Sequence, residues 1–414
     1  MKNSLKLNLG NIKERIVTGP RETALIFVDE IKLIFSDAGA VLLFMIAMFI
    51  YPLLYAIGYQ KEVVREIPVA VVDLDHSQTS RQYSRMADAT EQMHVVIKPA
   101  SLKEAEQLFY EGKVKGIVLI PDGFERDILS SKQTSVGVYC DASNFLLYKQ
   151  VFGGASFVNG TVNGGIEIKR MLAEGKSFAQ TLDQQEPLKV STYNLYNPAG
   201  GYGSFVMPGM ILIIIQQTLL IGIGMLGGTI REKNIFLKMT GKAKHHVGSV
   251  RLVFGKASAY VSVYLVNALF ALGILYKWYG YPDNSGFLDS VILFVPYVLS
   301  VSFLGMAISI FFKERVHSML FMVFLSPIVV FLSGLSWPVE AIPKGLYTIA
   351  HIFPSTTMIP AYIQMRSSGA DVAQIKPELI MLMIQAAIYF VMAVVAYHYA
   401  IRKFGKKIGV KASE

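Results

Sequence analysis

Cysteine is almost missing from this chain, which has a single one, Cys140, in 414 residues. A lone cysteine cannot form an intramolecular disulfide, so any domain outside a membrane must be held together by packing. Charged residues are also scarce, at 17% of the chain against 53% hydrophobic residues. Since soluble domains usually carry about 25% charged residues, this balance argues against a soluble protein.

The sequence also has no phosphate-binding loop of the form G-x-x-x-x-G-K-[ST]. Gly255-Lys256 is followed by Ala257, and six residues rather than four separate Gly255 from Gly248. The residues of such a loop cradle nucleotide phosphates. We therefore expect no ATP binding of that kind and no cofactor in this chain.

Residues suited to a metal or to catalysis are few. His245 and His246 are adjacent, whereas two histidines on one helix bind a metal from positions i and i+4. Asp73 and Asp75 follow a predicted strand, where carboxylates commonly form turns. We predict no metal site and no catalytic residue, and we expect Cys140 to be a small core residue.

Long uncharged apolar runs are what the sequence has in abundance. The clearest extends from Phe205 to Thr229 and is followed at once by Arg231-Glu232-Lys233. A run of about 20 such residues can cross the roughly 30 Å hydrocarbon layer as a helix. Six candidate spans result, at residues 38–60, 205–230, 257–276, 290–312, 316–338 and 379–401.

None of the six runs contains Asp, Glu, Lys or Arg in its interior. Ion-coupled transporters usually need ionisable groups within the membrane. If this protein moves a compound, its energy is therefore expected to come from a partner rather than from an ion gradient. The spacing of Gly224 and Gly228 in the second run matches G-x-x-x-G, which allows helices to approach closely.

The fifth run is the least regular, because Pro327, Gly334 and Pro338 interrupt it. The apolar stretch that follows, from Gly345 to Tyr362, contains prolines and polar residues. We predict that residues 339–362 form a re-entrant or interfacial segment.

Lysine and arginine set the predicted orientation, because cytoplasmic loops carry an excess of them. They gather before the first span, in the loop 231–256, at Lys313 and Arg315, and in the tail after residue 401. We therefore place both termini in the cytoplasm. The net charge of +9 follows from this topology, and the basic segments contain no recognisable nucleic-acid-binding module.

The N-terminal segment, residues 1–37, contains an amphipathic pattern from Thr23 to Phe35. Its apolar residues cluster, and Asp29, Glu30 and Lys32 are expected on the opposite face. A helix of this kind next to a span is expected to lie along the cytoplasmic membrane surface.

Residues 61–204 lie between the first two spans and have the balanced charge of a soluble domain. Short apolar strands alternate there with amphipathic helices, as in a small α/β unit. The predicted strands are 67–72, 93–97, 116–120 and 135–139. The predicted helices are 77–89, 102–110, 124–129 and 145–171. The predicted fold is an α-helical polytopic membrane protein with an extracytoplasmic α/β domain, followed by spans two to six and a basic tail in residues 205–414.

This layout resembles that of type-2 ABC exporter permeases with a large external domain between spans one and two. Arg231-Glu232-Lys233-Asn234 is similar to the motif that leads into the family's coupling helix, although the Gly-Thr step that usually follows is missing. A more specific match is the family's C-terminal pattern of spaced glycine, prolines and a Pro-Ser-Thr step. The positions that match this pattern are Gly334, Pro338, Pro343, Pro354, Ser355 and Thr356.

The resemblance implies a half-transporter that dimerises, with itself or with a sister permease, and docks separate ABC ATPase subunits that bind ATP and Mg. It assigns ATPase coupling to Arg231, Glu232, Lys233, Phe236 and Leu237. The expected cargo is a hydrophobic or amphipathic compound, drug-like or lipid-like, exported across the bacterial inner membrane. Further expected partners are membrane lipids and a periplasmic adaptor with its outer-membrane channel.

Two other classes of protein stay open. A membrane-anchored receptor or scaffold would bind its ligand through the external domain, but it needs fewer than six spans. An intramembrane enzyme would need a nucleophile and a base at membrane depth. Ser333, Ser336 and His351 are the nearby candidates, and their proline-rich surroundings favour a structural turn.

Overall fold

The computed structural model describes residues 2–185, 192–233 and 248–411, with side chains from residue 19 to residue 403 within these ranges. The chain divides into two compact units. One comprises Met1–Glu62 and Asn194–Glu414, and the other comprises Val63–Tyr193.

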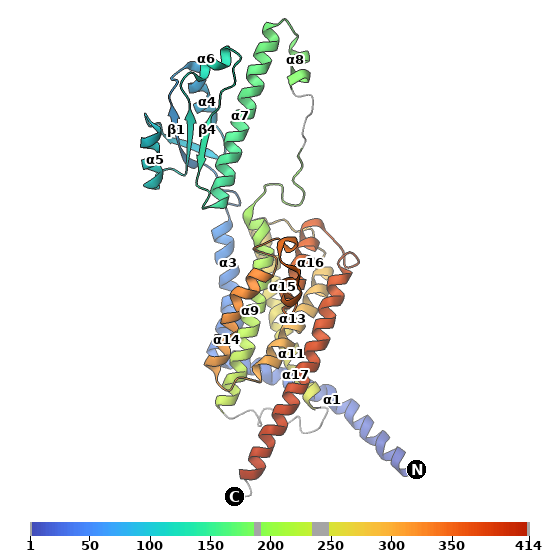
Figure 1. Ribbon diagram of the computed structural model, residues 1–414. Coiled ribbons are helices and arrows are strands. Elements are labelled where there is room, and N and C mark those ends of the chain that lie inside the picture. The colour runs from blue at the N-terminus through green and yellow to red at the C-terminus, as the bar shows by residue number, and fades with distance from the viewer. Residues whose placement is uncertain (1, 186–191, 234–247, 412–414) are drawn as a thin grey trace. The chain divides into compact units, whose positions relative to one another are not determined.

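Within its described residues, the first unit contains six helices that are long and apolar enough to cross a membrane, which confirms the predicted number. They are Ala38–Tyr59 (α2, η1 and α3), Tyr202–Glu232 (α9), Gly248–Tyr279 (α11, η3 and α12), Phe287–Ser309 (α13), Arg315–Leu332 (α14) and Lys376–Lys403 within α17 (Lys376–Lys411). Figure 1 shows them running side by side as a bundle.

Helix α9 is the centre of this bundle, because 89% of its most apolar window is buried, against 22% for α14 and for α17. Its glycines allow the close contact with α14. A Cβ atom added at Gly228 would lie 2.6 Å from Arg315 Cα, and one added at Gly224 would collide with Ser318 Oγ. The G-x-x-x-G spacing noted in the sequence therefore marks a real helix contact.

The third span begins earlier than the sequence predicts. Helix α11 starts at Gly248, so residues 248–256 of the predicted loop 231–256 are helical. Lys256, expected in that loop, is only 6% exposed. The predicted run 257–276 contains no charged residue, but the helix that includes it also carries Lys256, which is paired with a distant carboxylate, Glu30.

Helix α1 extends over Lys2–Ser36 and is longer than the predicted segment. Ile26 and Ile34 are buried, whereas Leu25 and Phe35 are exposed apolar residues. The placement of Glu30 on a polar outer face was wrong, since its side chain is 1% exposed and is covered by α11.

The fifth span also differs from its prediction, because α14 ends at Leu332 instead of residue 338. Gly334 follows with a φ of +81°, a left-handed conformation that favours glycine and ends the helix. The chain then forms the short helices η4 (Val339–Ala341) and α15 (Lys344–Ala350), and α16 (Pro354–Ser368) continues beyond the predicted re-entrant segment.

The second unit is built on a four-stranded sheet of order β2-β1-β3-β4. Strand β1 (Ile67–Asp73) pairs in parallel with β2 (Met93–Ile97) and β3 (Gly116–Ile120), and β4 (Gly137–Cys140) is antiparallel to β3. The predicted mixed α/β character is confirmed.

Successive side chains of β1 point to opposite faces of the sheet, and each face has its own apolar core. Val69 and Val71 pack with residues of α4 (Gln78–Asp88) and α7 (Phe145–Ala173). Ala70 and Val72 pack on the other face with α5 (Leu102–Tyr110). Two shorter helices complete the unit, α6 (Phe124–Leu129) and the unpredicted α8 (Phe178–Gln185).

The polar residues noted in this unit have local structural roles. Asp73 accepts hydrogen bonds from the backbone N–H of His76 at 3.0 Å and from Ser80 Oγ at 2.8 Å, which holds the turn into α4. Asp75 accepts one from the N–H of Glu125 at 3.1 Å. Cys140 is half-buried at the end of β4 and packs against the larger core.

Candidate functional site

The predicted coupling residues lie where α9 ends. Arg231 is partly buried and donates a hydrogen bond to the backbone carbonyl of Phe312 at 3.0 Å, while Glu232 and Lys233 are exposed. Phe236 and Leu237, like His245 and His246, lie outside the described residues. Arg231 thus joins the end of the second span to the segment between the fourth and fifth spans, a role that sequence reasoning did not assign to it.

Three segments meet at Arg315, the first residue of α14. Its guanidinium makes a bidentate ion pair with Asp37 at 2.8 and 3.0 Å and donates to Thr229 Oγ1 at 3.2 Å. Its backbone N–H donates to Glu232 Oε1 at 2.7 Å. We call Asp37, Thr229, Glu232 and Arg315 the Arg315 junction. It connects the entry of the first span, the end of the second and the start of the fifth.

The contacts in this junction favour the ionised form of the Asp37 carboxyl group. Burial by itself raises the pKa of Asp37, but the hydrogen bonds from Arg315 and from the backbone N–H groups of Ala40 and Gly39 outweigh burial and hold the pKa below its ordinary value. Asp37 also caps α2 by accepting from the N–H of Ala40 at 3.0 Å. The carboxylate therefore fixes the turn between α1 and the first span.

A second buried charge links α1 to α11 nearby. Lys256 Nζ lies 2.6 Å from Glu30 Oε2, and Tyr260 Oη donates to the other oxygen of Glu30. Further along the same two helices, Arg251 donates to Glu22 at 2.6 Å. We call Glu30, Lys256 and Tyr260 the Glu30 cluster. Helix α1 is thus joined by charge, as well as by apolar packing, to the helix that follows the predicted coupling loop.

The residues of the C-terminal motif occupy turns and helix starts. Gly334 ends α14, Pro338 and Pro343 precede η4 and α15, and Pro354 is the first residue of α16. Ser355 and Thr356 are both buried. Thr356 Oγ1 donates to the carbonyl of Ala350 at 2.8 Å, which closes the turn between α15 and α16.

The centre of α9 holds three consecutive polar residues, Gln216, Gln217 and Thr218, that sequence reasoning did not single out. All are buried, and each bonds a different element. Gln216 Oε1 accepts from the N–H of Ser355 at 2.8 Å, and Gln217 Oε1 accepts from Ser326 Oγ at 2.9 Å. Thr218 accepts from Tyr264 Oη at 2.9 Å. Polar groups at this depth are costly and mark functional positions more often than chance.

Two of these polar groups remain available for further bonds. Within the described part of the chain, the side-chain NH₂ groups of Gln216 and Gln217 find no hydrogen-bond acceptor although both are buried. An uncharged polar run inside an otherwise apolar span was the signal in the sequence that would have found this site.

The candidates for an intramembrane enzyme are engaged with their own backbone. Ser333 Oγ donates to the carbonyl of Val330 at 2.8 Å, and His351 Nδ1 lies 2.7 Å from the carbonyl oxygen of Tyr347. Ser336 is exposed beyond the end of α14. Among the residues with described side chains, no group of three or more His, Cys, Asp and Glu has a metal-binding arrangement.

Comparison with known proteins shows the family to which the chain belongs. Residues 39–395 match the family described as ABC-2 family transporter protein. The chain belongs to this family. It is also similar to the inner membrane transport permease YhhJ of Escherichia coli (strain K12) and of Shigella flexneri, with 25% identity over 361 residues, covering 83% of this chain and 87% of each relative.

The architecture is that of an ABC-2 transporter permease subunit. The match begins inside the first span and ends inside the sixth, so it includes both units of the structure. An ABC permease implies ATPase partner subunits, which agrees with the missing phosphate-binding loop. In this ABC-2 permease the Arg315 junction and the polar centre of α9 connect spans, and the Glu30 cluster connects α1 to the third span.

Proposed function

We propose that this chain is the membrane half of an ATP-driven exporter in the bacterial inner membrane. It works as a dimer, with a second copy or a sister permease, and two separate ATPase subunits bind ATP and Mg for it. Both termini face the cytoplasm. The observation that carries this proposal is the family match over residues 39–395, and the names of the relatives support the membrane assigned.

The cargo is a hydrophobic or amphipathic compound, drug-like or lipid-like. The polar centre of α9 supports this class, because Gln216, Gln217 and Thr218 provide hydrogen bonds without charge. A sugar or an ion would need more polar or charged groups along its path, since each polar group must be desolvated on entry.

ATPase coupling is assigned to the segment that begins at Arg231. In this proposal Lys233, Phe236 and Leu237 contact the ATPase, and Arg231 and Glu232 transmit the movement. Two contacts support the division of roles. Arg231 bonds the carbonyl of Phe312, and Glu232 bonds the first N–H of α14, so a displacement at the end of α9 reaches the fifth span directly.

The external unit is a candidate surface for a periplasmic adaptor and an outer-membrane channel. Helix α7 supports a protein partner, because it exposes aromatic residues at helical spacing. Phe145, Tyr148 and Phe152 are 70%, 37% and 54% exposed, and the last two stack at 5.9 Å. Clustered exposed aromatic residues are typical of interaction surfaces.

The test is purification of the tagged chain in mild detergent, followed by identification of its partners and measurement of ATP hydrolysis. A stoichiometric ATPase whose activity depends on this chain is expected. A lone chain, under conditions that preserve other ABC complexes, would contradict the proposal and favour the receptor or enzyme alternatives.

Variants refine the same test. Phe236→Ala and Leu237→Ala should lower the amount of ATPase that co-purifies, while the stability of the permease itself stays unchanged. Arg231→Gln should instead lower the permease's thermal stability, because it removes an internal bond. Full retention of the ATPase by the first two variants would remove the coupling assignment.

A further inference from the structure

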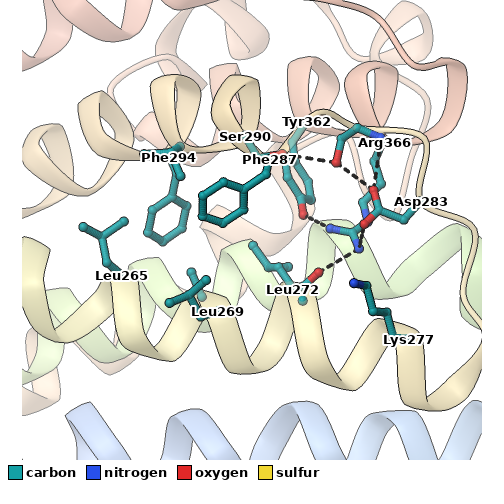
Figure 2. A pocket seen from close by; sticks show the side chains of 14 residues that line it. Leu265, Leu269, Leu272, Lys277, Asp283, Phe287, Ser290, Phe294, Tyr362 and Arg366 are labelled. Atoms are coloured by element: carbon teal, nitrogen blue, oxygen red, sulfur yellow. Dashed lines mark hydrogen bonds and ion pairs between the residues drawn. The ribbon is translucent and has the colours of Figure 1, made fainter.

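The third and fourth spans and α16 line an open pocket of about 340 Å³. Its walls come from residues 265–277, from the start of α13 and from the end of α16. Figure 2 shows that the pocket is polarised, with charged side chains at one end and apolar ones at the other.

The charged end is organised by Arg366, which is only 2% exposed. Its guanidinium lies 2.8 Å from Asp283 Oδ2, donates to the carbonyl of Leu272 at 2.7 Å and to Tyr362 Oη, and lies 3.5 Å from the ring centroid of Tyr276. Its Nε–H group has no hydrogen-bond acceptor within the described part of the chain. Arg366 is therefore a fixed cation with bonding capacity left over.

Lys277 lines the same end of the pocket and has an exposed side chain. Within the residues that the structure describes, no carboxylate lies within ion-pair distance of its ammonium group. Asp283 is the single carboxylate among the lining residues, and Arg366 already pairs with it. This end of the pocket thus has one more positive charge than negative charge.

The opposite wall is apolar and open to the surroundings of the bundle. Leu265, Leu269, Phe287 and Phe294 line it, and Leu269 and Phe287 are 51% and 70% exposed. From Lys277 to Leu265 the helix runs about 18 Å at about 1.5 Å per residue. This length is close to the hydrocarbon thickness of one leaflet, about 15 Å, which is half of the bilayer core.

Aromatic residues place the charged end at the membrane surface. Trp278 is 73% exposed, and Tyr279 and Tyr281 follow it and stack at 6.1 Å. Trp and Tyr concentrate at the level of the lipid headgroups. The charged end of the pocket is therefore at headgroup depth, and its apolar wall extends into the hydrocarbon layer.

We propose that this pocket binds an anionic phospholipid of the outer leaflet. Its phosphate lies at the charged end, beside Lys277 and Arg366, and one acyl chain lies along Leu265, Leu269 and Phe294. The excess positive charge selects an anionic headgroup, and the open apolar wall selects a lipid over a water-soluble phosphate. The site is separate from the ATPase-coupling segment and does not depend on which cargo is carried.

The test measures lipid binding to the purified full chain by native mass spectrometry in detergent. Phosphatidylglycerol and phosphatidylcholine with the same acyl chains are the probes. Phosphatidylglycerol is expected to bind several-fold more, and Lys277→Gln should remove that preference. Lys344→Gln is the matched control, because Lys344 is an exposed lysine on α15 that does not line the pocket.

A second variant tests the apolar wall. A Cβ atom added at Gly273 meets no atom within 4 Å, so Gly273→Leu should fill the pocket without straining the helix. It is expected to lower binding of both lipids several-fold. Equal binding of both lipids to the unmodified chain, unchanged phosphatidylglycerol binding in Lys277→Gln, or displacement of the lipid by glycerol phosphate would each overturn the proposal.

Discussion

Glu30 and Lys256 form a buried ion pair, with 2.6 Å between Oε2 and Nζ and exposed side-chain fractions of 1% and 7%. The two residues are far apart in the sequence and come from α1 and α11. Since Tyr260 satisfies the second carboxylate oxygen, the pair is bonded well enough to offset part of its desolvation cost. Its place beside the predicted coupling segment makes it the first contact to test.

Removing one partner of this pair should be strongly destabilising. Glu30→Gln leaves the Lys256 ammonium buried without a counter-ion, and such changes cost about 3–5 kcal/mol. We expect a clear fall in the thermal unfolding midpoint of the detergent-purified protein. The double variant Glu30→Leu with Lys256→Met should recover much of the loss, and Lys32→Gln on the exposed side of α1 is the control. Equal midpoints for Glu30→Gln and the control would contradict the buried pair.

Gly228 should not tolerate a side chain. A Cβ atom there would lie 2.6 Å from the backbone of Arg315, and forced overpacking costs about 1–3 kcal/mol. Gly228→Ala is expected to lower the thermal midpoint and to weaken any ATPase stimulation, because α9 and α14 must separate slightly. Gly58→Ala is the control, since a Cβ at Gly58 meets nothing within 4 Å. A midpoint for Gly228→Ala as high as that of Gly58→Ala would refute the close contact.

The ion pair between Asp37 and Arg315 should make stability depend on pH in the acidic range. The pKa of Asp37 is lowered in the folded protein, so its contribution is complete above the unfolded pKa of about 3.9 and is lost as the pH falls through the folded value. At pH 7, Asp37→Asn should cost about 1.5–3 kcal/mol, the range for hydrogen bonds to charged groups.

The comparison of both proteins across pH checks this directly. The difference in unfolding midpoint between the unmodified chain and Asp37→Asn should stay constant from pH 7 to about pH 5 and shrink below about pH 4. A difference that grows on acidification would show that the sign of the pKa shift is wrong.

Gln216 should stabilise the junction of α9 with α16. Gln216→Leu leaves the buried N–H of Ser355 without its acceptor, and an unsatisfied buried donor costs about 1–3 kcal/mol. Gln364→Leu is the control, because Gln364 is a glutamine with an exposed side chain. It lies on α16, the helix that contains Ser355. If both variants unfold at the same temperature, the bond to Ser355 contributes nothing. A loss of transport larger than the loss of stability would support a cargo role for this polar centre.

Local sequence patterns were sufficient to predict most of the architecture. A long uncharged run has few stable alternatives to a membrane helix, because every backbone polar group must be bonded within the segment. The six spans could therefore be predicted, as could the four strands of the external unit, whose apolar runs end at turn residues. Helix α5 agrees with its predicted range, since its amphipathic pattern is complete within nine residues.

The errors share one cause. Sequence patterns treat Glu30, Arg251 and Lys256 as surface charges, and this interpretation started the third span too late and placed Glu30 on an outer face. In the structure each charge meets a partner on another helix, so that Arg251 bonds Glu22 and Lys256 bonds Glu30. A local sequence pattern cannot reveal a contact between residues that are more than 200 positions apart in the chain.

The sequence by itself determined that this protein crosses a membrane six times and inserts an α/β unit after the first span, because those properties follow from the length and period of apolar runs. Only the tertiary structure decided which charges are neutralised within the bundle, which polar groups meet at the centre of α9, and that Arg366, Lys277 and an apolar wall share one pocket. These are long-range contacts, and helix packing alone sets them.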